Sequence, residues 1–400
     1  MEKLGSQKKR INGSIPGWSL ARDFYKDPEI FEKEKEKIIF DNWIFAGHVS
    51  QIQNSGDYFL FNLLEESVII VRGNDMEIRA FFNVCRHRGS HVCLEKSGNS
   101  KRFLCPYHAW TYDIDGSLFA ARGMPDSFDK SNHGLHPCAM DIIEGMVFIN
   151  FGDNPVSLEN VKRDLAGPLK MYDFNNLKVA THKRYPIDGN WKITLENYQE
   201  CYHCAPSHPE YSLSHTFKVE DDKFEELQKP MLSRMEALGV GTHEYDYQFD
   251  KQQEGQENYA CSRYALFEKY KTGSQDGKPL APLLGNLLGY DHGALDINIG
   301  SFTYYLCYND HIIVYVFTPT EHEKSACDIY WLVRNDAEEG KDYDLDKLTW
   351  LWNATTLADE RIIVDNQKGV NSKKYQSGPL AIKEKLIERY IVWYLDQLAK

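Results

Sequence analysis

The sequence predicts an α+β protein in which an all-β N-terminal domain precedes a larger α+β domain, an antiparallel sheet covered by helices. The chain has 400 residues, a length that suggests two domains. Residues 40–152 alternate in the manner of short strands separated by turns. The rest mixes helical periodicity with an aromatic strand region at 301–333. We therefore place a leading segment at 1–39, packed on the second domain, the all-β domain at 40–155 and the α+β domain at 156–400.

The composition is that of a soluble globular protein. Its formal net charge of −13 argues against a nucleic-acid binder, and the short basic run at 8–10 is interpreted as a solvated tail. The N-terminus has no apolar signal region and no run of about 18 apolar residues is present, so we expect a cytoplasmic protein without a membrane span. Nine cysteines, an odd number, fit a reducing compartment better than a disulfide framework.

The all-β domain is expected to present two loops at hairpin tips. Its apolar stretch at 58–71 is followed by a turn at 73–75, and residues 77–84 lead into the first loop. Short strands flank the second loop, and a hairpin turn follows at 115–116. Residues 146–151 close the domain.

Two cysteines and two histidines fall on these loops as C-x-H and C-x₂-H, with 17 residues between the halves: Cys85, His87, Cys105 and His108. This spacing suits a [2Fe–2S] cluster of the Rieske type, with thiolates on one iron and imidazoles on the other. A structural Cys₂His₂ zinc site is the alternative. Ligands at hairpin tips would lie near the surface, where electrons can enter and leave.

A second metal-binding segment is predicted further along the chain. Large apolar residues at helical spacing predict an amphipathic helix over 189–204: Trp191, Leu195, Tyr198 and Tyr202. Glu200 and His203 are three apart and share a face, whereas His203 and His208 would diverge on a continuous helix. Pro206 resolves this conflict, because it disfavours helical geometry at the preceding residue and lets His208 fold back toward His203.

The third ligand of that site is predicted on a helix at 345–369. Asp359 lies within an apolar stripe of that helix and Glu360 points away; the stripe consists of Leu348, Trp352, Thr355 and Ile362. Burying an unpaired carboxylate is unfavourable, and a metal ion would compensate for it. An acid that caps or pairs within the core is the alternative. With His203 and His208, Asp359 would complete a 2-His-1-carboxylate triad that holds Fe(II) and leaves positions open for O₂.

These motifs resemble those of the Rieske non-haem iron oxygenases, the ring-hydroxylating oxygenase α-subunit family. The resemblance extends over nearly the whole chain. The matching segments are CRHRGS at 85–90, CPYHAWTY at 105–112, ENYQECYHCAPSH at 196–208, and DERI with QKG at 359–369. The resemblance implies a Rieske domain at 40–155 and a catalytic mononuclear iron domain at 156–400. It further implies a homotrimer in which the cluster of one subunit passes electrons to the catalytic iron of the next through His108, Glu200 and His203.

One position departs from the pattern of the aromatic-ring dioxygenases. The residue three before the first iron histidine is commonly Asp in those enzymes, where it bridges the two metal sites, and here it is Glu200. A longer carboxylate can still accept hydrogen bonds from two imidazoles. Glu200 within ENYQECYHC resembles the branch that acts on quaternary ammonium compounds, such as carnitine monooxygenase, choline monooxygenase and glycine betaine or stachydrine demethylase.

The predicted function is that of a terminal oxygenase, which uses O₂ and electrons from NAD(P)H to hydroxylate a small quaternary ammonium or N-methylated compound. A separate flavin and iron–sulfur reductase is expected, because no G-x-G-x-x-G dinucleotide fingerprint follows a strand in this chain. The aromatic residues at 301–333 could supply a cage for the cation. An aromatic-ring-hydroxylating dioxygenase is the alternative, followed by a Rieske electron carrier and a zinc-stabilised binding protein. The second metal constellation argues against the last two.

Overall fold

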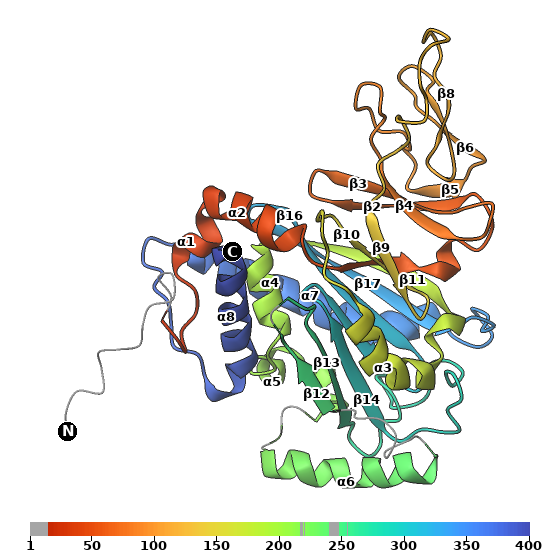
Figure 1. The fold of residues 1–400 in the computed structure, drawn as a ribbon. Coiled ribbons are helices and arrows are strands. Elements are labelled where there is room, and N and C mark those ends of the chain that lie inside the picture. The colour runs from red at the N-terminus through yellow and green to blue at the C-terminus, as the bar shows by residue number, and fades with distance from the viewer. Residues whose placement is uncertain (1–14, 217–218, 220, 240–247, 254) are drawn as a thin grey trace.

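Figure 1 shows the fold in a computed structural model that describes residues 15–400 apart from 217–218, 220, 240–247 and 254. Among these residues, antiparallel strands form three small sheets in the N-terminal part and one seven-stranded sheet in the rest. Helices cover the large sheet, so the predicted α+β class is confirmed. The basic run at 8–10, interpreted as a solvated tail, lies outside the described residues. Within the described part, no helix has the length and apolar character needed to cross a membrane.

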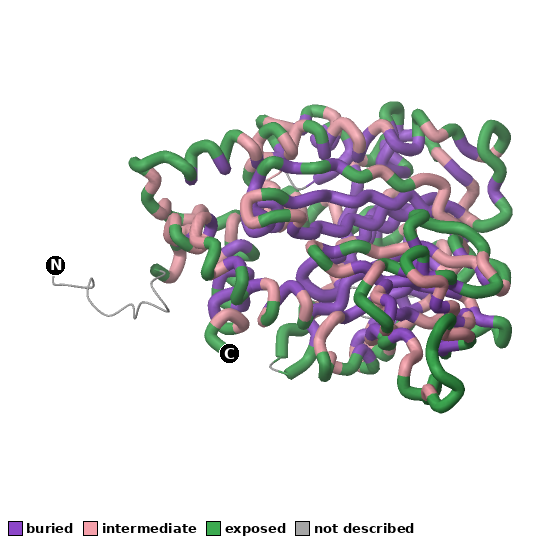
Figure 2. Tube along the Cα trace, turned by 90° about the horizontal axis from the view of Figure 1, so that it is seen from above, coloured by how far each residue is buried: buried purple, intermediate pink, exposed green. Residues whose placement is uncertain are grey.

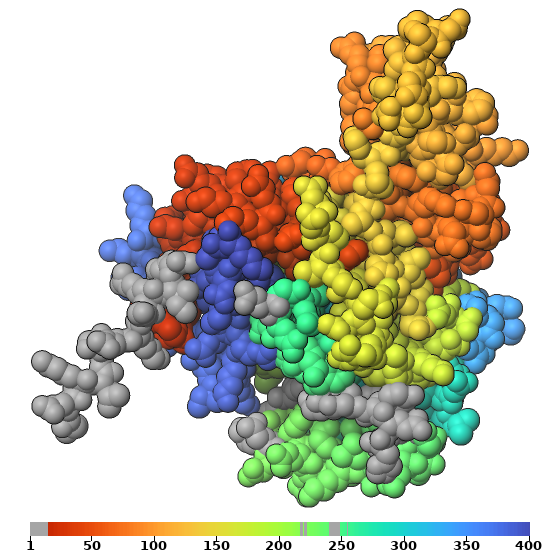
Figure 3. All heavy atoms as spheres, viewed as in Figure 1, coloured from red at the N-terminus to blue at the C-terminus, as the bar shows by residue number. Residues whose placement is uncertain are grey.

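The three small sheets are built from strands that follow one another between residues 44 and 150. Their strand orders are β1-β10-β9, β4-β3-β2-β5 and β6-β7-β8. The bounds are β1 Ile44–His48, β2 Asp57–Leu63, β3 Glu66–Arg72, β4 Ile78–Phe82, β5 Ser97–Asn99, β6 Arg102–Leu104, β7 Thr111–Asp113, β8 Leu118–Ala120, β9 Ala139–Ile143 and β10 Met146–Asn150. The part that includes β6 and β8 stands out from the rest of the molecule (Figure 3), so its loops lie at an exposed tip.

The turns of this region lie where the sequence predicts them, with one exception. The turn at 73–75 separates β3 from β4, and the hairpin turn at 115–116 separates β7 from β8, with Gly116 at φ +87°. The apolar stretch at 58–71, predicted as a single stretch, is two paired strands, because the chain reverses at Leu64 with φ +53°. Leu seldom adopts this conformation, and no Gly, Pro or Asn marks the turn in the sequence.

The seven-stranded sheet has the order β11-β17-β16-β15-β14-β13-β12. Its strands are β11 Leu177–Ile187, β12 Gln248–Lys251, β13 Tyr259–Ala265, β14 Gly293–Ile299, β15 Thr303–Cys307, β16 Ile312–Glu321 and β17 Lys324–Arg334. The aromatic region predicted at 301–333 therefore forms β15, β16 and β17. Nearly all residues of these strands are buried, and Figure 2 shows the buried segments running through the interior of the molecule.

Alternate residues of this sheet face different layers, as the strand period of two requires. The ring of Tyr304 lies 4.5 Å from that of Tyr198, a residue of a helix on one face. The neighbouring Tyr305 points the other way, and its ring lies 6.2 Å from that of Phe45 in β1. The large sheet is thus sandwiched between helices and the β1-β10-β9 sheet.

The helices are α1 Arg22–Lys26, α2 Pro28–Glu34, α3 Glu159–Tyr172, α4 Trp191–Tyr198, α5 Cys204–Ser207, α6 Asp221–Ala237, α7 Leu345–Val370 and α8 Lys385–Ala399. Helices α4 and α7 contact each other and pack on the β11, β16 and β17 side of the sheet. The leading segment contacts the C-terminal one: the ring of Phe24 in α1 lies 5.9 Å from that of Tyr394 in α8.

Candidate active site

The two loops that carry the cysteine–histidine pairs have the same backbone geometry. In each, the cysteine N–H donates to the carbonyl five residues later at 2.8 Å. The residue four after the cysteine, Gly89 or Ala109, donates its N–H back to the carbonyl of Cys85 or Cys105 at 3.0 Å. Gly89 and Ala109 also share a positive φ, 77° and 61°. Each loop thus presents one sulfur and one imidazole from a matching turn.

The side chains of these loops converge at the tip. Cys85 and Cys105 are buried and His87 is exposed, while the imidazole centroids of His87 and His108 lie 4.6 Å apart. Nδ1 of His108 is buried and has no hydrogen-bond partner among the described residues, which is expected of an atom that binds a metal. Two inner thiols and two outer imidazoles fit a [2Fe–2S] cluster. Zinc accepts the same donors, so the donor set alone does not separate the two.

A tyrosine hydroxyl contacts one of these sulfurs. The Tyr112 oxygen accepts the N–H of Arg86 at 2.9 Å, which leaves its own hydrogen free to point at Sγ of Cys85, 3.2 Å away. Hydrogen bonds to cluster sulfurs are one of the factors that set the reduction potential of an iron–sulfur centre.

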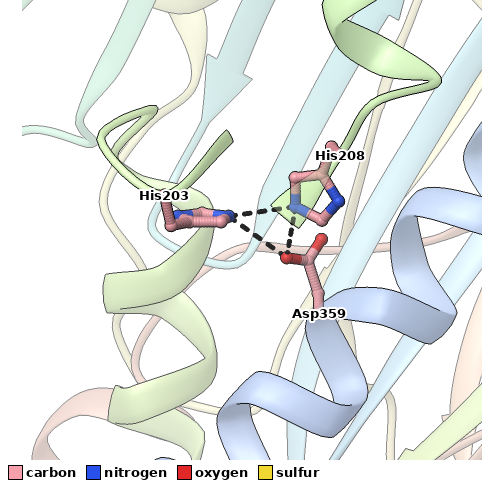
Figure 4. Close-up of side chains that lie close together, drawn as sticks. All are labelled: His203, His208 and Asp359. Atoms are coloured by element: carbon pink, nitrogen blue, oxygen red, sulfur yellow. Dashed lines mark hydrogen bonds and ion pairs between the residues drawn. The ribbon is translucent and has the colours of Figure 1, made fainter. Parts of the chain in front are cut away.

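The structure brings His203, His208 and Asp359 together in the second domain (Figure 4). The two Nε2 atoms lie 3.1 Å apart, and Oδ1 of Asp359 lies 3.2 Å from Nε2 of His203 and 2.9 Å from Nε2 of His208. One ligand atom from each residue falls within 4.8 Å of the others. Two imidazoles and one carboxylate on one side of a small space fit a 2-His-1-carboxylate site for Fe(II).

The local path of the chain differs from the prediction. The helix predicted over 189–204 ends at Tyr198, and Tyr202 is exposed instead of sharing its apolar face. Oε2 of Glu200 accepts the backbone N–H groups of Tyr202 and His203, and such local bonds compete with helix formation. Pro206 does not end the helix: it lies inside the short helix α5, in its first turn, where a missing N–H is tolerated. His203 and His208 flank α5.

The helix predicted at 345–369 is present as α7. Leu348, Trp352 and Thr355 of the predicted stripe are buried, and Ile362 is only half-buried. Asp359 follows on this face and meets the two histidines, while Glu360 is not part of the group.

The electrostatics of the site favour a positive charge between the three side chains. Burial lowers the pKa of His203, but hydrogen bonds and charges from Asp359 and Glu200 outweigh burial and raise that pKa to about 10. Burial raises the pKa of Asp359, yet bonds from His203 and His208 bring it below its usual value. A divalent cation among these ligand atoms would be stabilised by the same carboxylate charges.

Two further carboxylates lie behind the imidazoles. Oε1 of Glu200 is 2.5 Å from Nδ1 of His203, the ring nitrogen that faces away from Asp359. Oε1 of Glu210 is 3.6 Å from Nδ1 of His208. A carboxylate hydrogen-bonded to the outer nitrogen, as Glu200 is, fixes the tautomer and orientation of a metal-binding imidazole, whereas Glu210 lies beyond hydrogen-bond distance of His208.

A cavity of about 860 Å³ opens beside the triad. Its wall includes His203, His208 and Asp359 and a cluster of aromatic rings that pack on one another: Tyr198, Tyr304, Tyr315 and Phe317. Cys201 and Cys204 also line it.

Sequence reasoning missed Asp296, which lines this cavity, and Glu210, which lies near His208. Asp296 and Asn298 alternate with apolar neighbours in β14, a pattern that normally indicates a solvent-facing strand side. That side faces the cavity instead. The position of Glu210, two residues after His208, could have indicated a carboxylate near that imidazole.

The chain is similar to known proteins over both of its parts. The family model for the Rieske [2Fe-2S] domain matches residues 42–129, and that for the ring hydroxylating alpha subunit (catalytic domain) matches 174–400. The glycine betaine monooxygenase oxygenase subunit of Chromohalobacter salexigens is 33% identical over 387 residues, 95% of this chain and 86% of that protein. The carnitine monooxygenase oxygenase subunit of Acinetobacter pittii is 39% identical over 212 residues, 52% of this chain and 56% of that one.

A solved structure has the same architecture. The structure of a quaternary ammonium Rieske monooxygenase, described for carnitine oxidation by gut microbiota and inter-subunit electron transfer, matches with a TM-score of 0.73 and 25% identity over 96% of both chains. The matched domains imply a Rieske cluster rather than zinc, a mononuclear iron, and electrons supplied by a reductase. The chain therefore belongs to the ring-hydroxylating oxygenase α-subunit family of Rieske non-haem iron oxygenases.

Proposed function

We propose that this protein is the terminal oxygenase that hydroxylates a small quaternary ammonium compound, by N-demethylation or C–N cleavage. The observation that carries the proposal is the cavity, in which a 2-His-1-carboxylate group and a wall of aromatic rings face the same space. Such rings attract a quaternary ammonium ion by roughly 0.5–2 kcal/mol per contact. Relatives named for glycine betaine and carnitine support the same substrate class.

The metal ligands follow from the donor atoms described above. We assign the [2Fe–2S] cluster to Cys85, His87, Cys105 and His108, and the mononuclear iron to His203, His208 and Asp359. When bound, that iron would supply the activation of O₂ by which a C–H bond is hydroxylated. The chain itself orients the substrate: the aromatic wall holds the cation, and its position decides which C–H bond faces the metal.

The product follows from the bond that is hydroxylated. When an N-methyl group gains a hydroxyl, its C–N bond breaks and formaldehyde and the demethylated amine are released. Hydroxylation of the chain carbon beside nitrogen breaks the other C–N bond and gives trimethylamine and an aldehyde. Each turnover consumes one O₂ and one NAD(P)H and yields one water besides the oxidised product.

We further propose the assembly in which this chemistry runs. A separate flavin and iron–sulfur reductase supplies electrons to a cytoplasmic homotrimer, and each cluster serves the iron of the next subunit through His108, Glu200 and His203. Each chain divides into a leading segment at 1–39, a Rieske domain at 40–155 and a catalytic domain at 156–400. The contact between Glu200 and His203 supports this route.

Purified protein and a suitable reductase test the function. Glycine betaine, carnitine and choline should stimulate NADH oxidation and yield formaldehyde or trimethylamine in proportion to O₂ consumed. Asp359→Ala should abolish the product and leave the cluster spectrum unchanged. Substrate-stimulated formation of cis-diols from aromatic acids, with no response to any methylated amine, would overturn the proposal in favour of an aromatic-ring dioxygenase.

A further inference from the structure

The wall of the cavity includes Asp296, a carboxylate that belongs to neither proposed metal site. Asp296 is in the middle of β14, and its register partners in the sheet are Ser262 in β13 and Leu306 in β15. Cross-strand partners share a face, and on β15 Leu306 shares its face with Tyr304, which packs on α4. Asp296 therefore points to the side of the sheet that bears the triad, and it lines the same cavity.

The other acids of this cavity are each paired with a base. Glu200 and Asp359 contact the histidines, and Asp250 pairs with Arg389 at 2.5 Å. Asp296 has no such partner: among the described residues none forms an ion pair with it, and its Oδ1 is buried without a hydrogen-bond partner. Burial raises the pKa of Asp296 to about 8, although a hydrogen bond from Tyr264 opposes the shift.

The surroundings of Asp296 suit a cation that has no hydrogen to donate. A negative charge on Asp296 raises the pKa of four tyrosines, of which the first two line the cavity: Tyr198, Tyr211, Tyr264 and Tyr308. A buried carboxylate without a counter-ion is unfavourable, so a cation that enters next to Asp296 stabilises its ionised form and lowers its pKa. A quaternary ammonium ion is recognised by charge and ring faces alone, and this wall offers both.

We propose that Asp296 is the anionic contact for the quaternary ammonium end of the substrate and sets the preference of the cavity for a cation over a neutral group of the same shape. The inference rests on the proposed function, because it names the residue that selects that substrate class. Asp296 acts on the substrate charge and holds neither metal.

The test compares quaternary ammonium compounds with isosteres in which an uncharged carbon replaces the charged nitrogen. The cation choline is paired with the neutral 3,3-dimethylbutan-1-ol, and the zwitterion glycine betaine with the anion 3,3-dimethylbutanoate. Dissociation constants are measured by calorimetry on the metal-loaded enzyme without O₂, for the wild type and Asp296→Asn. Removing the charge should weaken choline binding roughly 10- to 100-fold and change the binding of its neutral isostere by less than about threefold. The ratio of the two constants is insensitive to the fraction of folded protein.

Glu257→Gln is the matched control, because Glu257 is also a buried carboxyl with a pKa raised to about 7 by burial but does not line the cavity. It should leave the ratio unchanged. Asp296→Glu should retain most of the preference, and Asp296→Ser provides a second neutral variant if Asp296→Asn does not fold.

The outcomes separate this inference from the proposed function. A wild-type enzyme that binds neither quaternary ammonium compound more tightly than its isostere refutes both. A wild type that prefers and oxidises the cation, with a preference that survives in both neutral variants, overturns the role of Asp296 and leaves the proposed function standing.

Discussion

Asp359 uses a single oxygen toward two imidazoles, and this contact defines the proposed iron site. Its Oδ1 lies within 3.2 Å of both Nε2 atoms, so a metal at this point would replace the proton that now links the acid to the bases. The role of each carboxylate near the site then depends on which nitrogen it faces.

Asp359→Ala should remove the mononuclear iron and spare the cluster, because the two metal groups share no residue. Iron should fall from about three toward two per chain, while the visible spectrum and acid-labile sulfide stay constant. Glu360→Ala, one residue further along α7, is the control and should keep all the iron. The reverse result, loss of iron in Glu360→Ala alone, would contradict the assignment.

Glu200→Gln should keep both metals and slow turnover roughly 10- to 100-fold. The amide oxygen can still accept the hydrogen bond from Nδ1 of His203, now 2.5 Å from Oε1, but the negative charge is lost. Single-turnover reoxidation of the reduced cluster reports the step directly. Glu210→Gln, beside the other imidazole, should slow it much less, and equal slowing in both variants would remove the special role of Glu200.

At the scale of elements, the sequence predicts what is periodic and misses what depends on single contacts. Helix α7 is predictable because its apolar stripe persists over many turns, and this also identifies Asp359. The end of α4 is not predictable from periodicity, because it depends on the Glu200 side chain accepting the backbone N–H groups of Tyr202 and His203. Asp296 is missed for a similar reason: a period of two separates the faces of a strand but does not show which face lines a cavity.

Three helices are joined by one buried ion pair. Glu34 in α2 accepts from Lys192 at 2.7 Å and from Trp191 at 2.8 Å, both in α4, and from Tyr394 of α8 at 2.5 Å. Neither charged side chain has any exposed surface. Removal of one partner leaves the other charge buried and unpaired. A single substitution in this pair should therefore lower the stability of the protein far more than one in a surface pair.

Glu34→Ala should therefore lower the free energy of unfolding by about 3–5 kcal/mol, and adding Lys192→Met should recover much of the loss. Glu65→Ala is the control: it breaks the partly exposed pair with Lys35 and should change stability by at most about 1 kcal/mol. Denaturant titration of all four proteins measures the effect. Equal losses for Glu34→Ala and Glu65→Ala would show that burial of the pair does not matter.

At the scale of the whole molecule, the two proposed metal sites lie in different parts of the chain. The loop of Cys105 and His108 directly follows β6 in the projecting part, and His203 and His208 flank α5 in the body (Figure 1). A head-to-tail arrangement of subunits can bring the tip of one chain to the body of the next, and a ring of three closes such a contact on itself.

Mixed trimers should test this arrangement. Cys105→Ala removes the cluster and Asp359→Ala removes the catalytic iron, so each variant alone should be inactive. If electrons cross between subunits, co-expression of the two differently tagged variants should restore activity, because an Asp359→Ala chain can donate to a neighbouring Cys105→Ala chain. With random mixing in equal amounts, roughly one interface in four has this order, and activity should approach that fraction of the wild-type value. Mixed trimers that remain inactive would require each cluster to serve the iron of its own chain, since no subunit in the mixture holds both metals.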